Sequence, residues 1–121
     1  KKLAVVITTP PFSNLTVTAH DYIESAINAG IEVVGLFFYQ DGVLNASKHL
    51  TIPSDEFQIM KLWVKLNKDH NVPLHLCITA AEKRGLSDDT AQGSTLADCF
   101  TISGLGELVE LSNLADRVVQ L

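Results

Sequence analysis

Cys77 is the residue whose type and position best suit chemistry. It lies near the end of an apolar run, residues 72–78, that predicts a buried strand, and the residues after it predict a short helix. A thiol at such a junction lies near the positive end of the helix dipole, where unpaired backbone N–H groups favour an anion such as a thiolate. The sequence therefore predicts a candidate nucleophile. The alternative is a small apolar core residue, because unpaired cysteines are among the most buried residue types.

The residues after Cys77 carry their own helix signals. Thr79 and Glu82 have the spacing of a capping box, which predicts a helix that starts directly after Thr79. Gly85 predicts the end of that helix. Lys83 and Arg84 would add positive potential near the thiol.

Two other residues could assist Cys77. His75 lies two positions earlier on the same strand, so both side chains point to one face and a Cys–His pair is conceivable. Their side chains would start about 7 Å apart, which makes a direct bond doubtful, and the alternative is a strand histidine bonded to a neighbour. Cys99 is a candidate resolving thiol. It would lie at the opposite end of a neighbouring strand, too far for a disulfide, so we interpret it as buried and inert.

Motifs for metals and cofactors are weak. His20, His49 and His70 show neither the H-x-x-x-H spacing nor the paired cysteines of a zinc site. The run 103–106, Ser-Gly-Leu-Gly, has half of a dinucleotide fingerprint, but the third glycine is missing and the run follows a late strand. We interpret its glycines as turn residues. We therefore expect no metal and no cofactor.

Strands and helices alternate along the chain. Apolar runs predict strands at residues 3–8, 31–39, 72–78, 99–103 and 117–121. Helical periodicity predicts helices at residues 16–29, from a cap at Ser54 to about Asp69, after Thr79, and at residues 105–114. This order predicts an α/β fold, a three-layer α/β/α sandwich with a mainly parallel five-stranded sheet, whose sites lie at the carboxyl ends of the strands. Cys77 lies at such an end.

Two surfaces could contact other molecules. Residues 40–52 have turn residues but no clear period, and we interpret them as a loop with one helical turn that could act as a lid or contact surface. The helix that follows has apolar residues on more than one stripe. Either a partner or a neighbouring loop would cover the additional stripe.

Composition limits the class of protein. The 121 residues suffice for a single domain, 1–121, and 46% of them are hydrophobic and 19% charged. The formal net charge of -5 argues against broad binding of nucleic acid, and no apolar run is long enough to span a bilayer. Two cysteines are too few for a disulfide framework, which favours a reducing, cytoplasmic location. We see no secretory signal.

Five segments together resemble the DsrE-like sulfurtransferases. They are residues 37–46 (FFYQDGVLNA), 54–57 (SDEF), 77–85 (CITAAEKRG), 100–106 (FTISGLG) and 116–120 (DRVVQ). They extend over nearly the whole chain, in the order of that family and with close to its spacing. Within the family, the chain is most similar to subunits of the relay that supplies sulfur for 2-thiouridine in tRNA.

The resemblance implies a DsrE-like fold and a transferase activity. Cys77 would be the active cysteine, whose thiolate takes the outer sulfur of a donor persulfide and becomes a persulfide itself. The donor would be a TusA-like protein and the acceptor a TusE-like protein, with the sulfur ending in the wobble uridine of tRNA. The resemblance further implies a heterohexamer with TusB-like and TusC-like subunits, two copies of each. It implies no cofactor and no direct contact with nucleic acid.

Three alternatives stay open on the sequence. A DsrE-type subunit of dissimilatory sulfur oxidation shares the cysteine position and the assembly. A non-catalytic scaffold subunit would build a complex around a thiol elsewhere. A redox sensor would oxidise Cys77 reversibly to a sulfenic acid.

Overall fold

Five strands form one sheet in the computed structural model, which describes residues 1–87 and 95–121. The strands are β1 (Lys2–Ile7), β2 (Glu32–Phe38), β3 (Leu74–Cys77), β4 (Phe100–Ser103) and β5 (Arg117–Gln120). Their order in the sheet is β4-β3-β2-β1-β5, and all four pairings are parallel. The predicted sheet is therefore confirmed, and it is parallel throughout.

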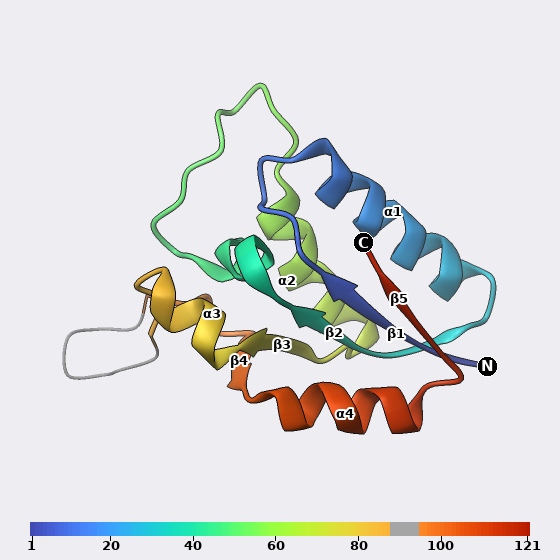
Figure 1. Ribbon diagram of the computed structural model, residues 1–121. Helices are drawn as coiled ribbons and strands as arrows, with labels where there is room; N and C mark the ends of the chain where they lie inside the picture. Colours follow the sequence, from blue (N-terminus) through green and yellow to red (C-terminus); the bar gives the residue numbers. More distant parts are fainter. Residues whose placement is uncertain (88–94) are drawn as a thin grey trace.

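Helices cover both faces of this sheet (Figure 1). They are α1 (Asn14–Asn28), α2 (Ile59–His70), α3 (Ile78–Lys83) and α4 (Leu105–Leu114). Helices α1 and α2 pack against each other on one face, whereas α4 lies on the opposite face. The predicted three-layer α/β/α arrangement is confirmed, and α4 has the bounds that its periodicity predicts.

Side-chain alternation along β2 explains how each face is filled. The ring of Phe38 meets Trp63 of α2 edge-on at 5.3 Å between centroids, and it meets Phe100 of β4 at 5.4 Å. Gly35 points to the other face, where a side chain would collide with Leu111 of α4. Large rings therefore fill the layer under α1 and α2, while the glycine lets α4 approach the sheet closely.

Helix α2 begins later than its apparent cap predicts. Ser54 is exposed in a turn, and the helix starts at Ile59, which is fully buried. The side-chain amide of Gln58 donates hydrogen bonds to the main-chain oxygens of Ile52 and Pro53 and thereby holds the preceding segment as a loop. Burial of Ile59 and these loop contacts outweigh the local capping signal at Ser54.

A 3₁₀ helix, η1 (Gln40–Ala46), follows β2 where the sequence predicts a loop with one helical turn. Its Asn45 is 1% exposed and donates to the main-chain oxygens of Thr9 and Gly42, at 3.1 and 2.8 Å. The side-chain oxygen of Asn45 accepts a hydrogen bond of 2.9 Å from Trp63 Nε1. One buried amide thus joins η1 to the end of β1 and to α2.

A substitution at Gly42 of η1 tests how closely this segment packs against the end of β1. A Cβ atom there would overlap the main-chain oxygen of Ile7, so we expect Gly42→Ala to lower the free energy of unfolding by about 1–3 kcal/mol. Gly106→Ala is the matched control, because a Cβ at Gly106 meets nothing within 4 Å. Urea denaturation of both variants measures the difference. Equal midpoints for the two would contradict the close approach of η1 to β1.

Candidate functional site

Cys77 lies at the carboxyl end of β3, as predicted, and directly precedes α3. Its backbone is extended, with φ -66° and ψ 121°, and it occupies the N-cap position of the helix. Its side chain forms no capping hydrogen bond. The first N–H groups of a helix lack partners within the helix, so Cys77 adjoins unpaired donors and the positive end of the helix.

The predicted capping box at Thr79 is wrong. Helix α3 begins at Ile78, so Thr79 lies inside the first turn, where it is exposed. Ala80 and Ala81 are 5% and 0% exposed, and packing these two residues into the core requires the helix to start where β3 ends. The tertiary contacts therefore determine the helix start here, rather than the local side-chain signal.

The predicted end of α3 at Gly85 is confirmed. Gly85 has a positive φ of 72°, and its N–H donates to the oxygen of Glu82 at 3.1 Å. The N–H of Leu86 donates to the oxygen of Ala81 at 2.9 Å. These two bonds form a Schellman motif, which requires the left-handed conformation that glycine adopts without strain.

A cavity of about 330 Å³ lies beside Cys77. Residues of β3, α3, α4 and the segment at the start of η1 line it, namely Tyr39, Gln40, Cys77, Thr79, Ala80, Lys83, Arg84 and Leu105. Cys77 itself is 2% exposed, so the thiol borders the cavity while most of the residue is buried. Such a position opens the thiol to a small molecule in the cavity and keeps bulk solvent away from it.

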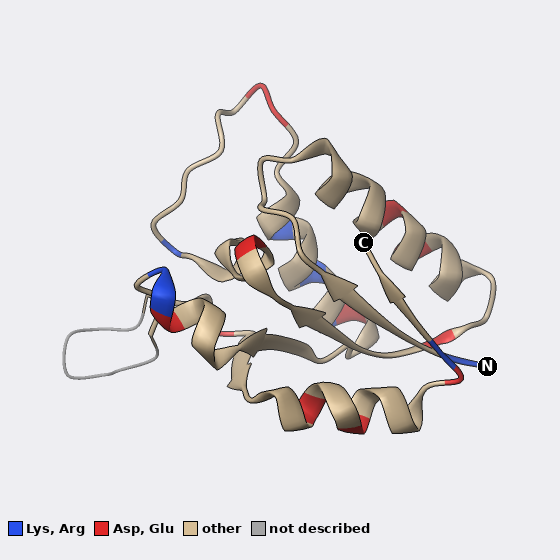
Figure 2. Cartoon of the chain, in the orientation of Figure 1, with Lys and Arg blue, Asp and Glu red and all other residues tan. Residues whose placement is uncertain are grey.

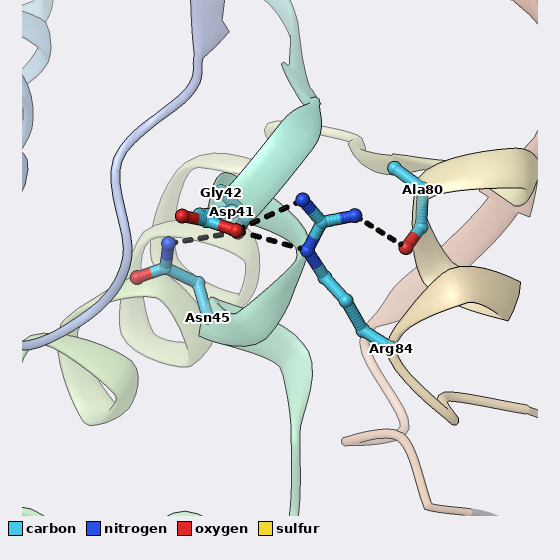
Figure 3. A network of polar contacts seen from close by, with 5 residues as sticks. All are labelled: Asp41, Gly42, Asn45, Ala80 and Arg84. Carbon is cyan, nitrogen blue, oxygen red and sulfur yellow. Dashed lines mark hydrogen bonds and ion pairs between the residues drawn. The ribbon is translucent and has the colours of Figure 1, made fainter.

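Arg84, one of the residues that line this cavity, connects the end of α3 to η1 (Figure 3). Its Nε and Nη2 donate to Asp41 Oδ1 at 3.0 and 2.9 Å, while Nη1 donates to the main-chain oxygen of Ala80 at 2.9 Å. The adjacent Gln40 has a φ of 51°, an uncommon conformation for a residue with a side chain. The arginine fork therefore fixes the segment that forms one wall of the cavity.

The two basic residues predicted near Cys77 differ in their pairing. Both line the cavity, but Asp41 neutralises the guanidinium of Arg84. Within residues 1–87 and 95–121, no ion pair joins Lys83 to a carboxylate, so its charge is the one available to a bound anion. Figure 2 shows the basic residues on separate elements, including α2, the end of α3 and the N-terminal strand.

His75 does not pair directly with Cys77. Its Nδ1 lies 3.0 Å from Ser103 Oγ at the end of β4, and its Nε2 lies 3.3 Å from Glu107 Oε1 in the first turn of α4. Both ring nitrogens thus have partners. The structure matches the alternative given above, a strand histidine bonded to its neighbours.

Cys99 lies just before β4, at the far end of that strand from the partner of Cys77, and both cysteines are free. It is half-buried rather than fully buried. Burial raises the pKa of the Cys99 thiol above its ordinary value, the negative charge of Asp98 adds to this, and a backbone hydrogen bond acts in the opposite direction. A raised pKa leaves less thiolate at neutral pH, in agreement with an inert thiol.

Other classes of site find little support in the described part of the chain. No group of three or more His, Cys, Asp or Glu side chains there could hold a metal ion. No described helix has the length and apolar character needed to cross a membrane.

The sequence analysis did not predict the side-chain contacts around this site. Asp41 and Arg84 are 43 positions apart, so no local spacing links them. Ser103 gave a usable signal, because it ends the strand after β3 and thus belongs to the same edge of the sheet as Cys77. Glu107 follows it in the first turn of the next helix.

Comparisons with known proteins identify the family and the fold of this chain. The model of the DsrE/DsrF-like family matches residues 1–121. Sulfurtransferase TusD of Salmonella typhi is 37% identical over 126 residues, which cover 98% of each chain, and this similarity supports the predicted sulfurtransferase activity. The crystal structure of the YchN protein of E. coli has the same fold, with a TM-score of 0.75, 23% identity, and coverage of 100% of this chain and 99% of that one. The chain therefore belongs to the DsrE/DsrF-like family.

Proposed function

We propose that this protein is a sulfurtransferase of a sulfur relay and that Cys77 holds the transferred sulfur as a persulfide. The observation that supports this most directly is the position of Cys77, at the carboxyl end of β3, before α3 and beside a cavity of about 330 Å³. The similarity to sulfurtransferase TusD over nearly the full length supports the reaction class. A single accessible thiol is sufficient for this chemistry, which needs no bound cofactor.

The reaction consists of two thiol exchanges. The Cys77 thiolate attacks the outer sulfur of a donor persulfide, the S–S bond of the donor breaks, and the donor leaves as a thiolate. An acceptor thiolate then attacks the outer sulfur on Cys77 in the same way. The first N–H groups of α3 and the charge of Lys83 would stabilise the sulfur anion before and after each exchange.

A sulfur relay requires protein partners, and exposed apolar side chains on α4 and β5 support an interface with another subunit. Leu105, Val109 and Leu114 of α4 and Val118 of β5 are 53%, 58%, 53% and 40% exposed. Several large apolar side chains exposed on consecutive elements are typical of subunit interfaces. We propose a heterohexamer with TusB-like and TusC-like subunits, two copies of each.

The similarity to sulfurtransferase TusD is the basis for proposing a donor and an acceptor. We propose a TusA-like donor, a TusE-like acceptor, and tRNA wobble uridine as the final destination of the sulfur. The tRNA would not contact this chain, whose basic residues lie on separate elements (Figure 2). A cytoplasmic location suits exchange between free thiols and persulfides.

Persulfide loading tests the role of Cys77. We expect Cys77→Ser to abolish the uptake of sulfur from glutathione persulfide, because the serine oxygen cannot form the stable S–S linkage. Cys99→Ser is the matched control and should load as the unchanged protein does. Mass spectrometry of the intact chain and of its peptides would detect the added sulfur on Cys77. Loading of Cys77→Ser to the same extent would refute the proposal.

The second thiol provides a test based on pH. Because the pKa of Cys99 is raised, this thiol should react slowly with iodoacetamide at neutral pH in the Cys77→Ser background. Its alkylation rate should reach a plateau at a higher pH than the rate of an ordinary thiol does. Asp98→Asn removes a charge that raises this pKa, so its plateau should begin at lower pH. The urea-unfolded chain serves as the reference for an ordinary thiol. Identical pH profiles for the folded and unfolded chains would show that burial does not control this thiol.

A further inference from the structure

Three polar side chains form a connected series beside Cys77. Ser103 Oγ is 3.0 Å from His75 Nδ1, and His75 Nε2 is 3.3 Å from Glu107 Oε1. The exchanges described above leave this series unused. We propose that Glu107, His75 and Ser103 act as a proton relay that removes the thiol proton of Cys77 during sulfur loading, an inference that rests on the proposed function.

Strand register places the end of this series next to the thiol. Cys77 of β3 and Ser103 of β4 are direct partners in a parallel pair, and neighbouring strands lie about 4.8 Å apart. Register partners point to the same face of a sheet, and so does His75, two positions before Cys77. The imidazole reaches along the strand to Ser103. Ser103 therefore contacts the ring of His75 and is the direct strand partner of Cys77.

Glu107 determines which ring nitrogen carries the hydrogen. A carboxylate can only accept, so we assign the hydrogen of the neutral ring to Nε2, which lies 3.3 Å from Glu107 Oε1. Nδ1 then presents a lone pair, and Ser103 donates its hydroxyl hydrogen to it. The lone pairs of the serine oxygen remain available to accept the thiol hydrogen of Cys77. In this arrangement each group donates its hydrogen to the next one, in the order Cys77, Ser103, His75 and Glu107.

The surroundings of His75 suit a transient positive charge. The side chains of His75 and Glu107 are 14% and 31% exposed, so their attraction is only partly screened by water. The strand partners of His75, Phe37 on β2 and Thr101 on β4, are neutral, and so is its hydrogen-bond partner Ser103. Glu107 is the charged group paired with the ring.

The proton balance of the loading step is complete. As Cys77 Sγ bonds to the outer sulfur of the donor persulfide, its proton moves to Ser103 Oγ and the serine proton moves to His75 Nδ1. The electron pair of the breaking S–S bond stays on the donor thiolate. That thiolate then takes a proton back from His75 through Ser103. His75 and Glu107 act through Ser103, so they are positioning residues for the thiol.

Single-turnover loading of the full chain by glutathione persulfide tests the relay. We expect His75→Asn and Ser103→Ala each to lower the loading rate at neutral pH about 10²-fold, as for loss of a general base. The double variant should be no slower than either single variant, because both interrupt one series. Ser103→Thr keeps the hydroxyl and should restore the rate. At alkaline pH, where thiolate forms without assistance, the variants should match the unchanged protein.

Matched substitutions on α4 distinguish loss of the proton relay from a nonspecific effect of removing a charge from this helix. Glu107→Gln should slow loading, whereas Glu110→Gln, an exposed position one turn further on, should not. Thermal unfolding followed by circular dichroism shows which variants are folded. Unchanged rates in His75→Asn and Ser103→Ala, or losses that persist at alkaline pH, overturn the relay and leave the proposed function intact. Failure of the unchanged protein to load Cys77 overturns the proposed function and the relay with it.

Discussion

The buried side chain of Asn45 is the contact on which the architecture near the site depends. Its amide nitrogen donates to Thr9 and Gly42, and its oxygen accepts from Trp63. A polar group that is 1% exposed is tolerated only when its hydrogen bonds are made, so these partners constrain one another. The amide fixes η1 against the end of β1 and against α2, and η1 begins with the residues that form one wall of the cavity.

The second constraint lies on the other wall. Helix α3 has only six residues, too few to be stable by itself, and it is held by burial of Ala80 and Ala81 and by the arginine fork on Asp41. With both walls fixed, the space between them is determined by the protein before any substrate enters. A preformed space would allow the transfer proposed for Cys77 to proceed without a large rearrangement.

The sequence predicts the parts that depend on local or periodic signals. Buried apolar runs identify all five strands, the bounds of α4 are correct, and the strand-to-helix position of Cys77 follows from the alternation of elements. The errors occur where packing overrides a local signal. Ser54 has the features of a helix cap, but contacts of Gln58 and burial of Ile59 delay α2 by several residues. Thr79 fails as a cap for the same kind of reason.

The side-chain contacts around the thiol could not be predicted from local spacing, because they join residues far apart in the chain. His75 and Ser103 are 28 positions apart and meet because β3 pairs with β4. Arg84 and Asp41 are 43 positions apart and meet because α3 packs against η1. The doubt about a direct Cys77–His75 bond was justified by strand geometry. What the strand spacing did not show is that Ser103, the partner of Cys77 on the neighbouring strand, bonds to His75.

The burial of Cys77 and the chemistry proposed for it are compatible. A persulfide is lost readily to small thiols, so a station that holds sulfur between two proteins needs protection from solvent as well as access for its partners. A residue that is 2% exposed at the edge of a cavity satisfies both needs, provided that the thiol can be deprotonated there. A polar series that begins at the adjacent strand offers a route for the proton that does not require water to enter the cavity.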